Sequence, residues 1–226
     1  MSVSALSAST QNYLKAIWGL TEWSSAQVTP TLIAERTGLK LSSVSDAVRK
    51  LASQGLVDHA PYGAVELTET GRSYALVMVR RHRLIEAFLV SVLGYSWDQV
   101  HDEAEHLEHA VSDFMIDRID ECLEFPTRDP HGDPIPSADG TVHIPEATQL
   151  TTVGAGHRVL VERISDSDPA LLQFFQEHGF VVGATLDVGE GAAFSDSLDV
   201  RVAEAASSVA WGRSATDALY VSIADG

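Results

Sequence analysis

The chain has 226 residues and 45% hydrophobic content, which allows one large domain or two to three small ones, each with a core. No run approaches the ~18–20 consecutive apolar residues of a membrane span, and the first ten residues lack the basic and apolar parts of a secretory signal. We therefore expect a cytoplasmic protein without a membrane partner. Cys122 is the single cysteine, which excludes an internal disulfide framework and a cysteine-rich zinc site.

The net charge of −17 argues against nucleic-acid binding, because phosphate neutralisation depends on Lys and Arg. The distribution of charge changes that conclusion. Residues 1–74 carry six basic and six acidic side chains, whereas residues 75–140 carry five and fourteen. The N-terminal segment of residues 1–74, called the head below, is thus neutral, and the chain that follows it is acidic. This arrangement favours DNA binding that is switched on when divalent cations bind to the acidic part.

The first segment has the pattern of a winged helix-turn-helix. Helices are expected over residues 10–23, 31–36 and 42–53, with a turn at Gly38. Residues 57–71 alternate around Tyr62-Gly63 and predict a two-stranded hairpin, the wing.

The remaining chain predicts a helical middle and a β-rich end. Apolar spacing indicates a long helix over residues 71–93 and a shorter one from Trp97 through Cys122. Residues 125–140 are rich in proline and glycine and are interpreted as a linker. Strands are expected at 157–164 and 183–188, with a short helix at 169–179. The predicted domains are a DNA-binding domain (1–73), a helical dimerisation and metal-binding domain (74–140) and a small β-rich domain (150–226).

The segment His101–His109 carries the clearest chemistry. At 100° per residue, His101, Glu105, Glu108 and His109 occupy one stripe about 100° wide. His82 and Glu86 share one face of the preceding helix. Imidazole and carboxylate without thiolate suit a hard or borderline divalent ion.

Alternatives remain open for this segment. An acidic helix with scattered histidines is often only a solvated face. Glu103-x-x-His106 has the spacing of ferritin-like di-metal sites, although no second such motif is present. A di-metal oxidase or hydrolase and a metal-storage protein are therefore rival hypotheses. No nucleophile–base motif and no phosphate-binding glycine loop is found, so no enzyme is predicted.

With the helix-turn-helix, the HDEAEHLEH stripe and the DPHGDPIP segment, residues 9–140 resemble the diphtheria toxin repressor family of metal-dependent regulators. The resemblance implies a mainly α protein with β structure. It has a winged helix-turn-helix, a helical domain that dimerises and holds two metal sites per subunit, and a C-terminal SH3-like small β-barrel. It also implies a homodimer that represses transcription by binding palindromic double-stranded operator DNA.

Carried over by position, the primary site resembles Glu105, Glu108 and His109, completed by Asn12. The ancillary site resembles His82, Glu86 and His101, to which Asp168, or in competition Asp166, adds a ligand from the C-terminal domain. Iron-responsive members have cysteine where this chain has Glu105, so the resemblance is to the manganese-responsive branch. That branch often has aspartate where this chain has Asn12. Mn²⁺ is the expected cofactor, and Fe²⁺ the alternative.

The DNA-facing positions also correspond to the family pattern. Small residues at the start of the second helix of the motif are expected to reach base edges, and flanking residues to meet phosphates. The base-edge candidates are Ser42, Ser43, Ser45 and Asp46. The phosphate candidates are Thr10, Thr31, Lys40, Arg49 and Lys50. Ser42 has a competing interpretation as the helix cap.

Overall fold

The structure is a computed structural model that describes residues 3–60, 63–203 and 207–224. The chain forms two compact units, each built from separated stretches. The first unit contains residues 1–85, 105–120 and 135–143, and the second contains 86–104, 121–134 and 144–226. Because this division splits the helical middle of the chain, the three predicted domains stay a prediction.

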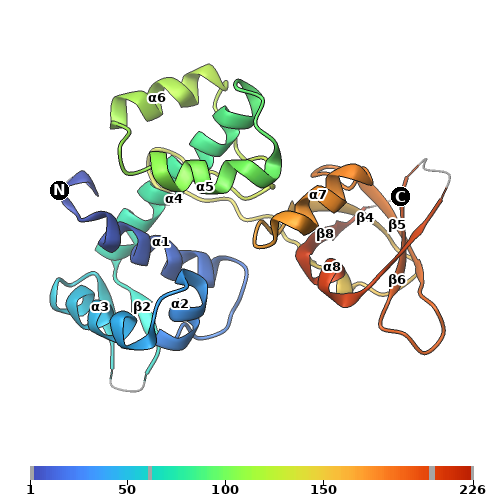
Figure 1. Ribbon diagram of the computed structural model, residues 1–226, viewed down its shortest axis with the longest axis horizontal. Helices are drawn as coiled ribbons and strands as arrows, with labels where there is room; N and C mark the ends of the chain where they lie inside the picture. The colour runs from blue at the N-terminus through green and yellow to red at the C-terminus, as the bar shows by residue number, and fades with distance from the viewer. Residues whose placement is uncertain (1–2, 61–62, 204–206, 225–226) are drawn as a thin grey trace. The chain divides into compact units, whose positions relative to one another are not determined.

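The first unit begins with the predicted helix-turn-helix (Figure 1). A short 3₁₀ turn (Val3–Ala5) precedes α1 (Ala8–Glu22), α2 (Pro30–Thr37) and α3 (Leu41–Ser53). Thr29 caps α2 through a hydrogen bond from the backbone N–H of Leu32, and Gly38 ends it at φ 67°, a left-handed conformation that favours glycine. These three helices confirm the predicted ones.

A hairpin follows the three helices and packs with them. Strands β1 (Val57–His59) and β2 (Val65–Leu67) pair antiparallel, with Val57 opposite Leu67. The predicted wing is therefore confirmed, although Tyr62 of its turn lies outside the described residues. The shared core of helices and wing is apolar, and its fully buried members include Leu14, Ile17, Ile33, Val44 and Val48.

The middle of the chain contains three helices where two were predicted. Helix α4 (Glu69–Ser91) matches the predicted long helix. The single helix expected from Trp97 through Cys122 is wrong, because the structure has α5 (Trp97–Leu107) and α6 (Asp113–Cys122). The hydroxyl of Ser112 accepts a hydrogen bond from the N–H of Met115, so it satisfies a free donor at the start of a new helix. None of the helices in the described ranges combines the length and apolar character needed to cross a bilayer.

The second unit contains a six-stranded antiparallel sheet in the order β3-β8-β4-β5-β6-β7. The predicted strands and helix in this region are confirmed as β4, β5 and α7. The elements are β3 (Thr148–Gln149), a 3₁₀ turn (Leu150–Thr152), β4 (Arg158–Ile164), α7 (Pro169–Glu177), β5 (Thr185–Glu190), β6 (Leu198–Val202), β7 (Val209–Trp211), α8 (Arg213–Ala218) and β8 (Leu219–Ile223).

The C-terminal sheet is open in the part of the chain that the structure describes. Strands β3 and β7 are its two edges, so the closed small barrel expected from the family resemblance is not observed. Its core is aromatic: Phe175 stacks on Trp211 with ring centroids 4.9 Å apart, and Phe180 packs on the same ring. Besides residues of α7 and the strands, this core includes Phe180 of the loop after α7, Leu150 of the 3₁₀ turn and Ala218 of α8.

The prediction that the proline-rich stretch 125–140 is a linker is wrong for its central residues. Asp129, His131 and Asp133 are all buried. Residues 128–134 form a closed loop on β4, in which Ile164 donates its N–H to the carbonyl of His131. A Cβ at Gly132 (φ 90°) would lie 2.2 Å from the carbonyl oxygen of Glu162, so this approach requires glycine.

Candidate metal centre and nucleic-acid interface

The first cluster of possible ligands lies in the first unit. His82 of α4, Glu105 of α5 and Glu108 each offer a ligand atom, and these atoms lie within 4.8 Å of one another. Nδ1 of His82 is 2.6 Å from Oε2 of Glu108, a carboxylate that is fully buried. An ionised carboxylate in that position needs a positive partner, because isolated burial of a charge is strongly unfavourable. The sequence placed His82 in the ancillary site with Glu86 and His101, and that assignment stays a prediction. The contacts described here also join His82 to the predicted primary ligands.

His109 directs one nitrogen toward this cluster. Its Nδ1 lies 2.6 Å from Oε1 of Gln11, and Nε2 of Gln11 donates to the carbonyls of Val3 and Leu6, so Nδ1 is the donor. The other nitrogen, Nε2, is buried, makes no hydrogen bond among the described residues and lies 3.5 Å from Oε1 of Glu108. Ligating histidines commonly donate their second ring N–H in this way. His109 therefore has the orientation expected of a metal ligand.

The C-terminal end of α5 falls within the stripe of ligands that the sequence predicted. Helix α5 stops at Leu107, and Glu108 and His109 lie in the turn that follows, where Ala110 donates to the carbonyl of Leu107. The stripe on one continuous helix is thus only partly correct. The turn still brings Glu105, Glu108 and His109 to one place.

Helix α1 contributes side chains that sequence reasoning missed. Asn12, the predicted fourth ligand, is exposed. Gln11 and Lys15, one turn apart on α1, instead reach His109 and the two glutamates. Their i, i+4 spacing was visible in the sequence, but no pattern there connects α1 to a turn almost a hundred residues later. The role of Asn12 as a ligand remains a prediction.

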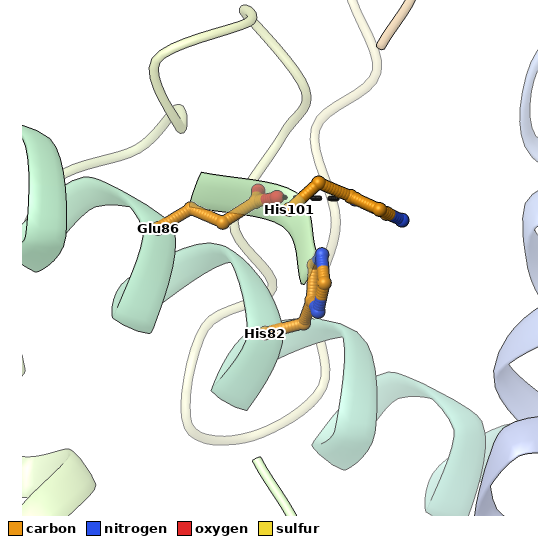
Figure 2. A group of neighbouring side chains, drawn as sticks. All are labelled: His82, Glu86 and His101. Carbon is orange, nitrogen blue, oxygen red and sulfur yellow. Dashed lines mark hydrogen bonds and ion pairs between the residues drawn. The ribbon is translucent and has the colours of Figure 1, made fainter. Parts of the chain in front are cut away.

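The second cluster lies in the second unit around Glu86 and His101. Figure 2 shows Glu86 of α4 paired with His101 of α5, while His82 stands one helical turn before Glu86 on α4. Nδ1 of His101 is 3.3 Å from Oε1 of Glu86 and 3.3 Å from Oδ2 of Asp166. Burial by itself would lower the pKa of His101, but the hydrogen bonds and charges of Asp166 and Glu86 raise it to about 10. The two carboxylates therefore stabilise the positively charged form of this imidazole.

The loop on β4 adds two further candidates to this cluster. Glu86, Asp129 and His131 offer ligand atoms within 4.8 Å of one another, and all three side chains are buried. Nε2 of His131 lies 3.3 Å from the carbonyl of Trp97, whereas its Nδ1 is buried without a hydrogen bond to any described residue. Because a carbonyl oxygen only accepts, Nε2 is the donor in this contact and Nδ1 presents a lone pair. The DPHGDP motif contains both Asp129 and His131, but the interpretation of this stretch as a linker left them out of the predicted metal sites.

Asp168 and Asp166 have different surroundings. Asp168 is exposed and caps α7, where its Oδ1 accepts hydrogen bonds from the N–H groups of Ala170 and Leu171. Asp166, the competing candidate, makes the contact with His101.

The candidate DNA-binding residues lie mostly on the surface of the helix-turn-helix. Thr31, Lys40, Ser42, Ser43, Asp46, Arg49 and Lys50 are exposed, and Ser45 is half-buried. Lys40 occupies the N-cap position of α3, so the interpretation of Ser42 as the cap is wrong. Arg49 forms an ion pair with Asp46, and Thr10 is buried with its hydroxyl 2.9 Å from that of Ser7. The side chains at the start of α3 are therefore exposed to solvent, as contact with a DNA groove would require.

The donors of both clusters fit a divalent metal ion. They are imidazole nitrogens and carboxylate oxygens, and each cluster contains a buried imidazole nitrogen without a hydrogen bond among the described residues. Such donors suit hard and borderline ions. A winged helix-turn-helix joined to clusters of this kind defines a metal-dependent DNA-binding regulator.

Comparison with protein families agrees with this class. Residues 5–65 match "Iron dependent repressor, N-terminal DNA binding domain", and residues 68–137 match "Iron dependent repressor, metal binding and dimerisation domain". Residues 148–222 match the FeoA domain.

Individual relatives show how far the similarity extends. The iron-dependent repressor IdeR of Mycobacterium tuberculosis is 40% identical over 129 residues, or 56% of this chain and 55% of the relative. The chain thus spans about half the length of the first curated relatives it matches. IdeR of Mycobacterium leprae is 34% identical over 194 residues, covering 79% of this chain and 83% of the relative.

Solved structures resemble almost the whole chain. A manganese-dependent transcriptional repressor in complex with manganese is 50% identical, with a TM-score of 0.90, and the match covers 95% of this chain and all of that one. A second manganese-dependent transcriptional repressor is 44% identical with a TM-score of 0.78, at the same coverage. The chain belongs to the diphtheria toxin repressor family of metal-dependent transcriptional repressors, whose members are regulators and not enzymes.

Proposed function

We propose that this protein is a manganese-dependent repressor that binds palindromic operator DNA as a homodimer when its metal sites are filled. The observation that carries the proposal is the convergence of Glu105, Glu108 and Nε2 of His109 beside α1, the first helix of the DNA-binding head. The similarity to two manganese-dependent repressors supports the choice of metal.

The donors in the first cluster favour manganese. Glu105 supplies a hard oxygen that can bind through one or both atoms, and no thiolate is present at this place. His82, Glu105, Glu108 and His109 would hold the ion. The ion would neutralise the two carboxylates and would link Glu108 and His109, in the turn after α5, to His82 and Glu105.

A second site per subunit would use the donors of the second unit. Glu86, His101, Asp129, His131 and Asp166 supply two imidazoles and three carboxylates. The pairing of His101 with two carboxylates supports a cation at this place. The SH3-like assignment of the C-terminal sheet belongs to the same proposal, and its six antiparallel strands support it.

Dimerisation has support in exposed apolar side chains of α6. Phe114 is 72% exposed and Met115 is 47% exposed, an arrangement that solvent disfavours unless a partner covers it. In a dimer the two α3 helices must lie roughly 34 Å apart to enter successive major grooves. An error in the orientation of either head therefore prevents binding of both.

Metal dependence follows from the residues of α1. Gln11 and Lys15 contact the ligand cluster, and the same helix packs against α2 and α3 in the apolar core of the head. Shifting the protein from mostly inactive to mostly active requires about 5.5 kcal/mol of differential metal affinity, which four sites in a dimer can supply together.

The test is DNA binding with and without metal. A duplex is selected from a random pool by the manganese-loaded protein, and its binding is measured by fluorescence anisotropy in Mn²⁺ and in chelator. Strong binding in Mn²⁺ alone is expected, together with a two-fold symmetric selected sequence. Equal binding in chelator would refute the switch.

An iron-dependent repressor is the second candidate, because the curated relatives from Mycobacterium are iron-dependent repressors. Titration of the same duplex under anaerobic conditions with Fe²⁺ and Mn²⁺ separates the two. Activation at a lower free concentration of Fe²⁺ would favour iron.

A further inference from the structure

Lys15 of α1 lies where the ligands of the first cluster converge. Its Nζ is 2.6 Å from Oε1 of Glu105 and 2.7 Å from both carboxylate oxygens of Glu108. Nδ1 of His82 is 3.3 Å away from the same Nζ. The ammonium group thus contacts three of the proposed ligands at once, with its side chain only 15% exposed.

This geometry is that of a cation held by a metal-binding group of donors. An ammonium group donates up to three hydrogen bonds, and here the acceptors are carboxylate oxygens of Glu105 and Glu108 that a divalent ion would bind. Metal ions bind such oxygens at about 2.0–2.6 Å. An ion bonded to Glu105 and Glu108 would therefore lie close to Nζ, and two cations in a buried site repel strongly.

We propose that the Lys15 ammonium is an internal competitor for the first metal site, and that a divalent ion binds there only by displacing it from Glu105 and Glu108. The inference rests on the proposed metal site. It goes further by assigning to Lys15 the control of the metal concentration at which the site fills. Because the competitor is tethered to the chain, its local concentration at the site is fixed by the fold.

The position of Lys15 on α1 connects this exchange to the DNA-binding head. Gln11, one turn earlier, contacts His109, and the apolar face of the same helix carries Leu14 and Ile17 into the core of the head. Release of Lys15 therefore removes one tie between α1 and the turn after α5, while Gln11 keeps another. The exchange alters how α1 is held without unfolding the cluster.

The experiment compares Mn²⁺ affinity in the wild type, Lys15→Met and Lys15→Arg by competition with a fluorescent chelator. Met has similar length without the charge, and Arg keeps the charge. Lys15→Met should bind Mn²⁺ at least about tenfold more tightly, because a nearby like charge is removed. Lys15→Arg should bind no more tightly than the wild type. Arg213→Met, an exposed change on α8 with the same loss of charge, should leave the affinity unchanged.

Thermal unfolding provides a second measurement. In chelator, Lys15→Met should unfold at a lower temperature than the wild type, because Glu105 and Glu108 lose their partner. Its rise in Tm on adding Mn²⁺ should exceed that of the wild type.

The outcomes separate this inference from the proposed function. If the wild type binds Mn²⁺ and Lys15→Met binds it equally or more weakly, Lys15 orients the glutamates and the competitor role is wrong. If the wild type itself does not bind Mn²⁺ through Glu108 and His109, as their Ala variants would reveal, the proposed site fails. A tighter Lys15→Met with an unchanged Arg213→Met supports the competitor.

Discussion

Gln11 and His109 are joined by a 2.6 Å hydrogen bond in which the imidazole Nδ1 donates to the amide oxygen. The amide nitrogen of Gln11 in turn donates hydrogen bonds to the carbonyls of Val3 and Leu6. The bond therefore fixes the ring of His109 so that Nε2 is presented to Glu108. It also connects the N-terminal segment to a proposed metal ligand.

Replacing Gln11 by Leu should weaken Mn²⁺ binding about 10–100-fold, as is typical when the partner of a ligating histidine is removed. The imidazole would lose the acceptor that sets its tautomer. Chelator competition measures the affinity, and Gln176→Leu, an exposed change on α7, is the matched control. An unchanged affinity in Gln11→Leu would show that the ring is held by other contacts.

His109→Ala should abolish metal-dependent DNA binding, whereas His106→Ala should be nearly silent. His106 is exposed, while His109 directs a buried nitrogen to the cluster. Anisotropy titrations of both variants with Mn²⁺ provide the comparison. Equal damage from the two changes would contradict this assignment, and a requirement for His106 alone would favour the ferritin-like alternative.

Glu105→Cys should shift the metal response from Mn²⁺ toward Fe²⁺ and Co²⁺. Affinity rises from manganese through iron to cobalt for most sites, so a manganese sensor must select by ligand hardness and geometry. Position 105 is half-buried at a polar site, and the smaller thiol should not prevent folding. The measurement is the ratio of half-activation concentrations under anaerobic conditions for both proteins. A constant ratio would assign selectivity to other residues.

Asp166→Ala and Asp168→Ala should separate binding from stability. Loss of Asp166 removes a partner of His101 and should lower Mn²⁺ binding at the second site. Loss of Asp168 removes the cap of α7 and should destabilise the protein by about 1 kcal/mol with metal stoichiometry unchanged. Calorimetric titration and chemical denaturation of both variants test this pair. Reversed effects would restore Asp168 as the ligand.

Glu162→Gln should reduce the pH dependence of stability. Burial alone would raise the pKa of Glu162, but hydrogen bonds from Ser222 and Arg128, with the charge of Arg128, hold it below its ordinary value of 4.5. A lowered pKa contributes stability that is present above pH 4.5 and is lost as pH falls through the folded-state pKa. The wild type should therefore exceed Glu162→Gln in unfolding free energy most at pH 5 and above. Urea denaturation between pH 3 and pH 6 measures this difference, and a constant difference would contradict it.

Local patterns in the sequence were sufficient for most of the head. The helices around Gly38, the hairpin and the long α4 follow from apolar spacing, caps and turns, all of which act over a few residues. The same short-range logic identified Glu105, Glu108 and His109, since they lie within one turn of one another along the chain. It failed at Ser112, where a cap inside an apolar pattern starts a new helix.

Tertiary structure decided which residues meet across long separations. Lys15 and Glu108 are 93 positions apart, Gln11 and His109 are 98 apart, and no periodicity links them. Proline and glycine in the 128–134 loop excluded a helix but did not reveal that the loop packs on β4 with His131 fully buried. Pairing across the C-terminal sheet likewise depends on contacts between distant strands, as in β4 with β8. The donor types were readable in sequence because they are properties of single residues, whereas the placement of a competing cation among them is a property of the packed fold.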